Sequence, residues 1–214
     1  MRVLGRRPAL YSSTHPVEEV VVVTADGERR RLAAKVAPQR EIDAYRDALS
    51  KLDLATPDFV GAFGDVLLLE WVEGTPLWQS GALADWEAAA RWLARLHALP
   101  VAEPLPRAVF RAPLEVLRHP AAARLAALPA VPVHGEFYPS NVLVSAGRIR
   151  PLDFETFGLG PGVIDLAALT AGDWPGDEPA RIEAAYLAAL PAGLRPSPGA
   201  LEDARLLVGL QCAA

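Results

Sequence analysis

The chain has 214 residues, of which 51% are hydrophobic and 22% charged, and its formal net charge is −5. This composition is that of a folded globule with a sizeable core, so it excludes an intrinsically disordered chain. The acidic balance offers no long-range attraction for nucleic acid or for an anionic membrane. The single cysteine, Cys212, excludes an intramolecular disulfide and a multi-cysteine metal site. No stretch resembles a signal peptide or a membrane span, so we expect a cytoplasmic protein without nucleic-acid or membrane partners.

The first 72 residues predict a β-rich unit with one helix. Residues 19–24 and 29–36 are rich in apolar and β-branched side chains and flank a turn that contains Asp26 and Gly27, which predicts a β-hairpin. Behind Pro38, apolar side chains recur at helical spacing up to Leu52, and the helix should end before Pro57. Residues 59–63 and 66–72 predict a second hairpin, whose last strand is apolar enough to be central.

The rest of the chain predicts a mainly helical unit. Residues 73–81, EGTPLWQSG, are rich in turn formers and predict a hinge. An amphipathic helix follows, because apolar residues and one histidine recur at spacings of 3 and 4 at Leu83, Trp86, Ala90, Leu93 and His97. One or two short helices are expected within residues 100–132, and further helices at 163–171, 180–190 and 201–212. We therefore predict an α+β fold with an N-terminal lobe (1–72), a hinge (73–81) and a C-terminal lobe (82–214).

Two oxygen-bearing side chains stand at the ends of a third predicted hairpin, formed by residues 142–144 and 148–152. Asn141 precedes Gly147 in the turn by six residues, and Asp153 follows it by six. An antiparallel hairpin thus returns Asp153 to the neighbourhood of Asn141. One neutral and one charged oxygen ligand suit Mg²⁺ that shares its other positions with water and substrate phosphates. The alternative is that both residues only cap backbone groups at a strand end and a turn.

An acidic residue precedes Asn141 at a spacing that favours the catalytic interpretation. Residues 134–141 read H-x-E-x-x-x-x-N, with His134, Glu136 and Asn141 at the fixed positions. Kinase catalytic loops separate their acidic residue and a metal ligand by the same interval, because one loop orients the attacking hydroxyl while its end holds the ion.

The segments HGEFYPSNVLV, PLDFE and GPGVIDLAAL together resemble the aminoglycoside phosphotransferase and choline kinase-like family. That family shares the pattern HGDxxxxN, then an aspartate after a short hairpin, then an Asp-Leu-Ala helix start. The segments LLLEWVEGTPL and AAARWLARLHAL are similar to its hinge and its first large-lobe helix. The resemblance covers residues 19–172 and implies a two-lobed, protein kinase-like fold with the nucleotide between the lobes.

The resemblance assigns roles to residues of the catalytic segment. Glu136 stands in place of the family's catalytic aspartate, and Asn141 and Asp153 stand at its metal ligands. Asp165 matches an aspartate that braces the catalytic loop, and His134 is either catalytic or a residue that shapes the loop. His97 is interpreted as a packed helix residue.

The resemblance also places the nucleotide. Lys35, one of only two lysines in the chain, matches the strand lysine that contacts the α- and β-phosphates, and Glu41 is its expected partner, with Asp43 as a rival. The expected phosphate-covering loop lacks glycine, so contacts there fall to Ser12, Ser13 and Thr14. The base should meet the backbone at Glu70, Trp71 and Val72.

The expected activity is Mg²⁺-dependent transfer of the γ-phosphate of ATP or GTP to a hydroxyl of a small molecule. Glu136 replaces the usual aspartate and is longer by one methylene, which leaves a nucleotide-binding pseudokinase as an alternative. A kinase-like enzyme that modifies protein or transfers another part of the nucleotide, and a protein without ligand, are further alternatives. The acceptor is not specified by the sequence. The apolar terminal helix suggests a homodimer.

Overall fold

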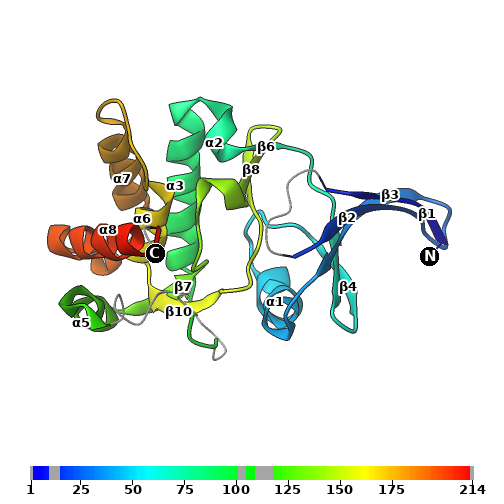
Figure 1. Ribbon diagram of the computed structural model, residues 1–214, viewed down its shortest axis with the longest axis horizontal. Helices are drawn as coiled ribbons and strands as arrows, with labels where there is room; N and C mark the ends of the chain where they lie inside the picture. Colours follow the sequence, from blue (N-terminus) through cyan, green and yellow to red (C-terminus); the bar gives the residue numbers. More distant parts are fainter. Residues whose placement is uncertain (1, 10–14, 101–104, 109–117, 213–214) are drawn as a thin grey trace.

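The computed structural model describes residues 2–9, 15–100, 105–108 and 118–212 (Figure 1). Its N-terminal part is a five-stranded antiparallel sheet in the order β1-β2-β3-β5-β4. The strands are β1 (Arg2–Pro8), β2 (Val17–Val23), β3 (Arg29–Val36), β4 (Phe59–Phe63) and β5 (Val66–Glu70). Both predicted hairpins are present. The strand β1 was not predicted, because it is exposed along its whole length and forms by pairing with β2.

One helical segment connects β3 to β4. It starts as α1 (Gln39–Asp43), continues through a π-helical turn (Ala44–Ala48) and ends in a 3-10 turn (Leu49–Lys51). Ile42, Tyr45 and Leu49 are buried on the side that the apolar spacing predicted. The change to π-helical geometry is a tertiary feature that the spacing did not indicate.

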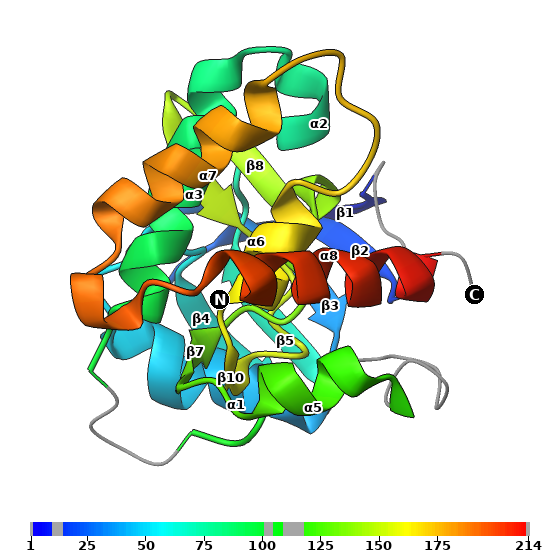
Figure 2. The same ribbon diagram turned by 90° about the vertical axis from the view of Figure 1, so that its left-hand side faces the viewer.

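The C-terminal part is mainly helical, as predicted. Its helices are α2 (Leu77–Ser80), α3 (Leu83–His97), α5 (Pro120–Ala126), α6 (Val163–Leu169), α7 (Glu178–Ala189) and α8 (Pro198–Cys212). Figure 1 shows α3 beside α7, and in Figure 2 the long α8 passes between α5 and α6. Among the described residues, no helix is long and apolar enough to cross a membrane.

Two small antiparallel sheets lie within the helical part. One has the order β6-β8-β9, and the other pairs β10 with β7. Their strands are β6 (Thr75–Pro76), β7 (Ala130–Val133), β8 (Val142–Ser145), β9 (Arg148–Pro151) and β10 (Gly158–Pro161). Residues 73–81, predicted as a hinge, thus contain β6 and α2, with β6 paired to β8. The division of the chain into lobes at these residues stays a prediction.

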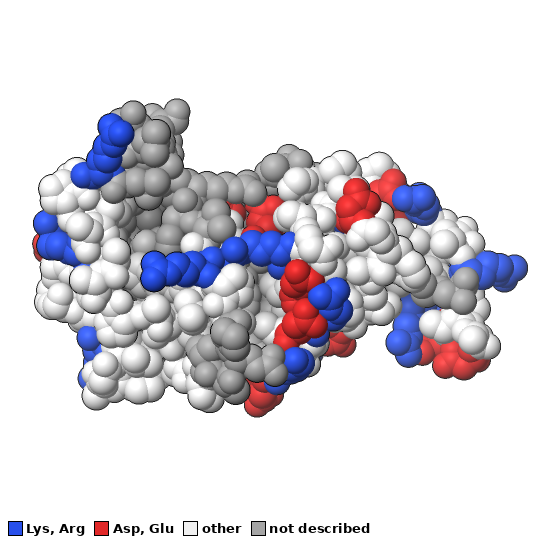
Figure 3. Space-filling model, turned by 90° about the horizontal axis from the view of Figure 1, so that it is seen from below, with Lys and Arg blue, Asp and Glu red and all other residues white. Residues whose placement is uncertain are grey.

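The surface carries charges of both signs. Figure 3 shows Lys and Arg next to Asp and Glu in the middle of the face seen from below.

On the terminal helix α8, Leu206 and Leu210 are 43% and 39% exposed. An apolar surface is therefore present there, as expected, while the homodimer stays a prediction.

Candidate active site

Lys35 holds three elements together at the centre of the candidate site. It lies near the end of β3, and its Nζ is 2.9 and 2.8 Å from the two carboxylate oxygens of Glu41 in α1. The same Nζ lies 2.7 Å from Oδ1 of Asp153, which follows β9. Lys35 and Asp153 are 118 positions apart in the chain. The two carboxylates were predicted for different tasks, and the fold brings both to one ammonium group.

Burial and the neighbouring carboxylates shift the pKa of Lys35 in opposite directions. Burial alone would lower the pKa of Lys35, but the negative charges of Glu41 and Asp153 outweigh it and raise that pKa. Burial raises the pKa of Glu41 to about 7, against the attraction of the Lys35 ammonium. Lys35 therefore stays charged at neutral pH and presents a fixed cation at the site. Of the two rival partners for Lys35, the structure selects Glu41, because the side chain of Asp43 pairs with Arg46 instead.

The predicted catalytic hairpin is formed by β8 and β9. Val142 pairs with Pro151, so Asn141 stands opposite Leu152, and the Leu152 N–H donates to the Asn141 carbonyl oxygen at 2.8 Å. Asp153 directly follows Leu152, so the hairpin returns it to the neighbourhood of Asn141, as predicted. Asp153 has a left-handed backbone with φ of 63°, which Asp and Asn tolerate better than most residues.

The loop before the hairpin folds back on Asn141. The Nδ2 of Asn141 donates to the backbone oxygen of Glu136 at 3.0 Å. This bond defines the orientation of the amide, so its Oδ1 is the atom available as a ligand. The Glu136 side chain is half-buried.

Asp165 braces the loop with its carboxylate, as the resemblance implied. It is fully buried near the start of α6, and it accepts the backbone N–H of His134 at 2.7 Å and that of Gly135 at 2.8 Å. The carboxylate also lies 3.2 Å from Nε2 of His97, whose Nδ1 is 2.8 Å from the hydroxyl of Tyr186. His97 is thus more than a packed helix residue, because it links α3 and α7 to the group that holds the loop.

Gly162 leaves room for His97. A Cβ on Gly162 would lie 2.6 Å from Nδ1 of the histidine, which no real contact tolerates. The sequence signal for this packing is the glycine directly before the VIDLAAL helix, from which the contact with His97 was not predicted.

His134 shapes the loop and has no free nitrogen for catalysis. Its Nε2 lies 2.8 Å from the Leu152 carbonyl oxygen, and its Nδ1 accepts the Glu136 N–H at 3.3 Å. Burial lowers the pKa of His134 against the charge of Asp165, so the ring is neutral and its Nε2–H donates. The ring of Phe154, next to Asp153, lies 4.5 Å from His134 and 5.5 Å from Tyr45 between ring centres. These rings connect the π-helical turn after α1 to the predicted catalytic loop.

We expect Asp165→Asn to destabilise the protein strongly. The amide would place an N–H₂ group against one of the N–H groups of residues 134 and 135, and each buried donor left without an acceptor costs about 1–3 kcal/mol. The free energy of unfolding in urea should therefore fall by about 2 kcal/mol or more. Asp173→Asn, at an exposed position, is the matched control and should leave it unchanged. Equal stability of both variants would contradict the bracing role.

One further acidic residue of the site was not predicted. Glu155, two residues after Asp153, is buried, and oxygens of Glu41, Asp153 and Glu155 lie within 4.8 Å of one another. Its carboxylate is also 3.3 Å from Nε2 of His15. The signal was the second acid of PLDFE. Carboxylate and amide oxygens of this kind fit a hard cation such as Mg²⁺.

Residues 70–72, which were predicted to meet the base, begin three positions along β5 from the residue that pairs with Lys35. Lys35 pairs with Leu67, and Leu32 pairs with Glu70, so Glu70 is three residues from the position beside the lysine. The Glu70 carboxylate pairs with Arg150, and the Trp71 N–H donates to the Arg31 carbonyl oxygen at 3.2 Å.

Val72 is half-buried. No hydrogen bond or ion pair that we find among the described residues joins these three positions to Lys35, so their role stays a prediction. Ser12, Ser13 and Thr14 lie outside the described residues.

Comparisons with known proteins support the resemblance. Residues 103–199 match the family model described as the phosphotransferase enzyme family. No match was found among curated proteins.

Among solved structures, a choline kinase from Streptococcus pneumoniae has a TM-score of 0.72 at 17% identity, covering 100% of this chain and 84% of that one. An aminoglycoside phosphotransferase from Streptomyces rimosus, in complex with ADP and streptomycin, has a TM-score of 0.64 at 23% identity, covering 97% and 92%. A macrolide 2′-phosphotransferase from Brachybacterium faecium has a TM-score of 0.64 at 19% identity, covering 93% and 81%. The family match and the shared fold confirm that this chain is similar to the aminoglycoside phosphotransferase and choline kinase-like family and has its two-lobed α+β, protein kinase-like fold.

Proposed function

We propose that the protein is a small-molecule phosphotransferase that moves the γ-phosphate of ATP, or of GTP, to a hydroxyl group with the help of Mg²⁺. The observation that carries this proposal is the contact of Lys35 with both Glu41 and Asp153, next to the loop that holds Glu136 and Asn141. Phosphoryl transfer depends mainly on positioning and charge neutralisation, and this arrangement supplies a fixed cation and several oxygen ligands at one place.

Each residue has a distinct proposed task. Lys35 contacts the phosphates, and Glu41 keeps its ammonium group in place. Asn141 and Asp153 hold Mg²⁺, and a carboxylate oxygen of Glu155 lies within 4.8 Å of one of Asp153. Bound Mg²⁺ would neutralise charge that develops on the phosphates. Glu136 accepts a hydrogen bond from the acceptor hydroxyl, orients its oxygen and takes its proton as the new bond forms.

The donor and acceptor classes follow from what similar proteins bind. The structure from Streptomyces rimosus contains ADP and streptomycin, which supports ATP as the donor and a small hydroxyl compound as the acceptor. GTP has no such support. In this proposal the nucleotide lies between the lobes, with its base at residues 70–72 and its phosphates near residues 12–14.

We expect Lys35→Arg to weaken ATP binding although the charge is kept. Lys35 is only 8% exposed and is enclosed by Glu41 and Asp153, so the larger, planar guanidinium cannot take the place of a compact ammonium group. The loss of one charge-assisted hydrogen bond corresponds to about tenfold in Kd. Calorimetric titration with ATP and Mg²⁺ measures it, and Lys51→Arg, at the only other lysine, is the control. Equal affinities would show that Lys35 does not contact the nucleotide.

A nucleotide-binding pseudokinase is the second candidate. The observation that favours it is Glu136, because its carboxylate stands one methylene farther from the backbone than that of the aspartate usual in the family. A displacement of about 1 Å can lower a rate about 100-fold.

The test of the proposed function is a screen of hydroxyl acceptors with ATP and with GTP in Mg²⁺. Aminoglycosides, other antibiotics, sugars and amino alcohols form the panel, and product mass is the readout. An acceptor whose mass rises by one phosphoryl group supports the phosphotransferase. Nucleotide binding without any product across the panel would favour the pseudokinase.

A further inference from the structure

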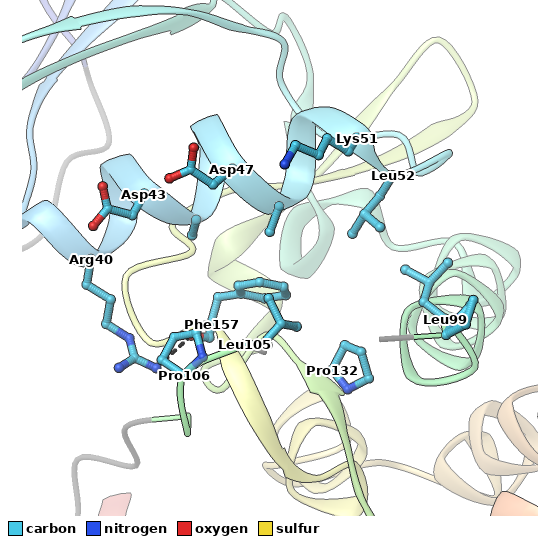
Figure 4. A pocket seen from close by; sticks show the side chains of 13 residues that line it. Arg40, Asp43, Asp47, Lys51, Leu52, Leu99, Leu105, Pro106, Pro132 and Phe157 are labelled. Atoms are coloured by element: carbon cyan, nitrogen blue, oxygen red, sulfur yellow. Dashed lines mark hydrogen bonds between the residues drawn. The ribbon is translucent and has the colours of Figure 1, made fainter. Parts of the chain in front are cut away.

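A cavity of about 720 Å³ lies beneath α1 and the helical turns that continue it. Ala44, Ala48 and Leu52 line it from the helical segment, and Leu99, Leu105 and Phe157 line it from the helical part of the chain. Figure 4 shows the apolar side chains gathered below the helix. This volume is within the range of pockets that enclose small molecules.

The cavity and the candidate active site lie on different sides of α1. Glu41 points to Lys35 and Asp153. Arg40, Ala44 and Ala48, spaced by four residues, line the cavity instead. The helix therefore separates the two sites, and each of them contacts residues of the same short element.

Arg40 gives the cavity a positively charged end. Its Nη2 donates to the Phe157 carbonyl oxygen at 2.7 Å and also to the Arg107 carbonyl oxygen. Its Nε is buried without a hydrogen-bond partner among the described residues. Burial lowers the pKa of Arg40, with no carboxylate acting against it. A buried cationic N–H without an acceptor favours an anionic ligand group.

The acidic residues near the cavity do not supply that group. Asp43 and Asp47 pair with Arg46 at 2.5 and 2.8 Å. In Figure 4 both carboxylates point away from the apolar side chains. The positively charged side chains that line the cavity are therefore Arg40 and Lys51.

We propose that this cavity binds a small carboxylate with an aromatic or branched apolar body. The carboxylate accepts the Nε–H of Arg40, and the apolar body lies among Leu52, Leu99, Leu105 and Phe157. The ligand also stabilises the position of α1 in which Glu41 contacts Lys35, because it fills space between that helix and the rest of the protein. This coupling to nucleotide binding rests on the proposed function, whereas the ligand site itself does not.

The probe for the site is 4-phenylbutyrate, and 4-phenylbutan-1-ol is its uncharged match. Leucine methyl NMR reports where each compound binds. We expect saturable shifts at Leu52, Leu99 and Leu105 but not at the exposed Leu206 and Leu210 of α8. The alcohol should bind about tenfold more weakly, because it cannot form a charge-assisted bond with Arg40. Equal binding of acid and alcohol, or shifts at α8 alone, would overturn the proposal.

Two variants and a matched control test the assignment. Arg40→Gln should weaken 4-phenylbutyrate binding about tenfold, since it removes the cation. Ala48→Trp fills the cavity and should abolish binding even if Arg40→Gln perturbs folding. Arg91→Gln changes an exposed arginine of α3 that does not line the cavity and should bind normally. Unchanged affinity in Ala48→Trp would place the ligand elsewhere.

A separate measurement, the affinity for ADP, tests the coupling between the cavity and nucleotide binding. Saturating 4-phenylbutyrate should increase the affinity for ADP severalfold in the wild type and not in Ala48→Trp. If ADP binds equally with and without the probe, the link through α1 is wrong. If ADP does not bind at all, the proposed function fails, while the methyl shifts still decide whether the cavity is a ligand site.

Discussion

Asp153→Asn should abolish the Mg²⁺ dependence of ATP binding while the protein stays folded. In the proposed site Asp153 is the charged ligand that shares the ion with Asn141, and the amide keeps the shape but loses the charge. Loss of a direct ligand should weaken ATP binding in Mg²⁺ by about 100-fold or more, since even residues that only orient ligands contribute roughly 10–100-fold. Calorimetric titration with and without chelator measures this effect.

The choice of asparagine follows from the backbone. Asp153 has φ of 63°, and an alanine there would add strain of about 1 kcal/mol that has nothing to do with the metal. Asp65→Asn, at an exposed position in the turn between β4 and β5, is the control and should bind ATP normally. ATP affinity that responds neither to Asp153→Asn nor to chelator would refute the metal assignment.

Glu136→Gln should lower the turnover number by about 100-fold or more, within the range of a positioned general base. The amide keeps the size of the side chain but cannot take the proton of the acceptor hydroxyl. ATP affinity should hardly change, because Glu136 serves the acceptor side. Its backbone contacts with His134 and Asn141 do not involve the carboxylate, so the substitution leaves these two contacts in place. Steady-state kinetics with the acceptor found in the screen measures both effects.

Glu136→Asp distinguishes an enzyme whose loop fits the longer glutamate from a family member that has lost activity through this replacement. If the loop fits the longer side chain, the shorter aspartate should lower the rate. If the protein is a decayed family member, restoring the usual residue should raise it. Wild type and Glu136→Gln that are equally inactive towards every acceptor, while both bind ATP, would lead us to adopt the pseudokinase interpretation.

Local features of the sequence determined much of the architecture. The hairpin of β2 and β3, that of β4 and β5, and the hairpin between Asn141 and Asp153 follow from strand-forming runs around turn residues, and α3 follows from helical spacing. These are short-range properties, because neighbouring residues decide where a turn forms and which face of a helix is apolar. The proposed catalytic segment could be predicted for the same reason, since Glu136, Asn141 and Asp153 lie within 18 consecutive residues.

Tertiary structure decided what no local pattern contains. Strand β1 is exposed and exists through its pairing with β2, and the π-helical turn after α1 has no signal in the spacing. The two acidic partners of Lys35, the bonds from Asp165 to the loop and the cavity beside Arg40 join residues from distant parts of the chain. Such contacts depend on how separate elements pack, and the packing of a buried charge or a cavity reflects the sum of all the surrounding side chains rather than the residues beside it in the sequence.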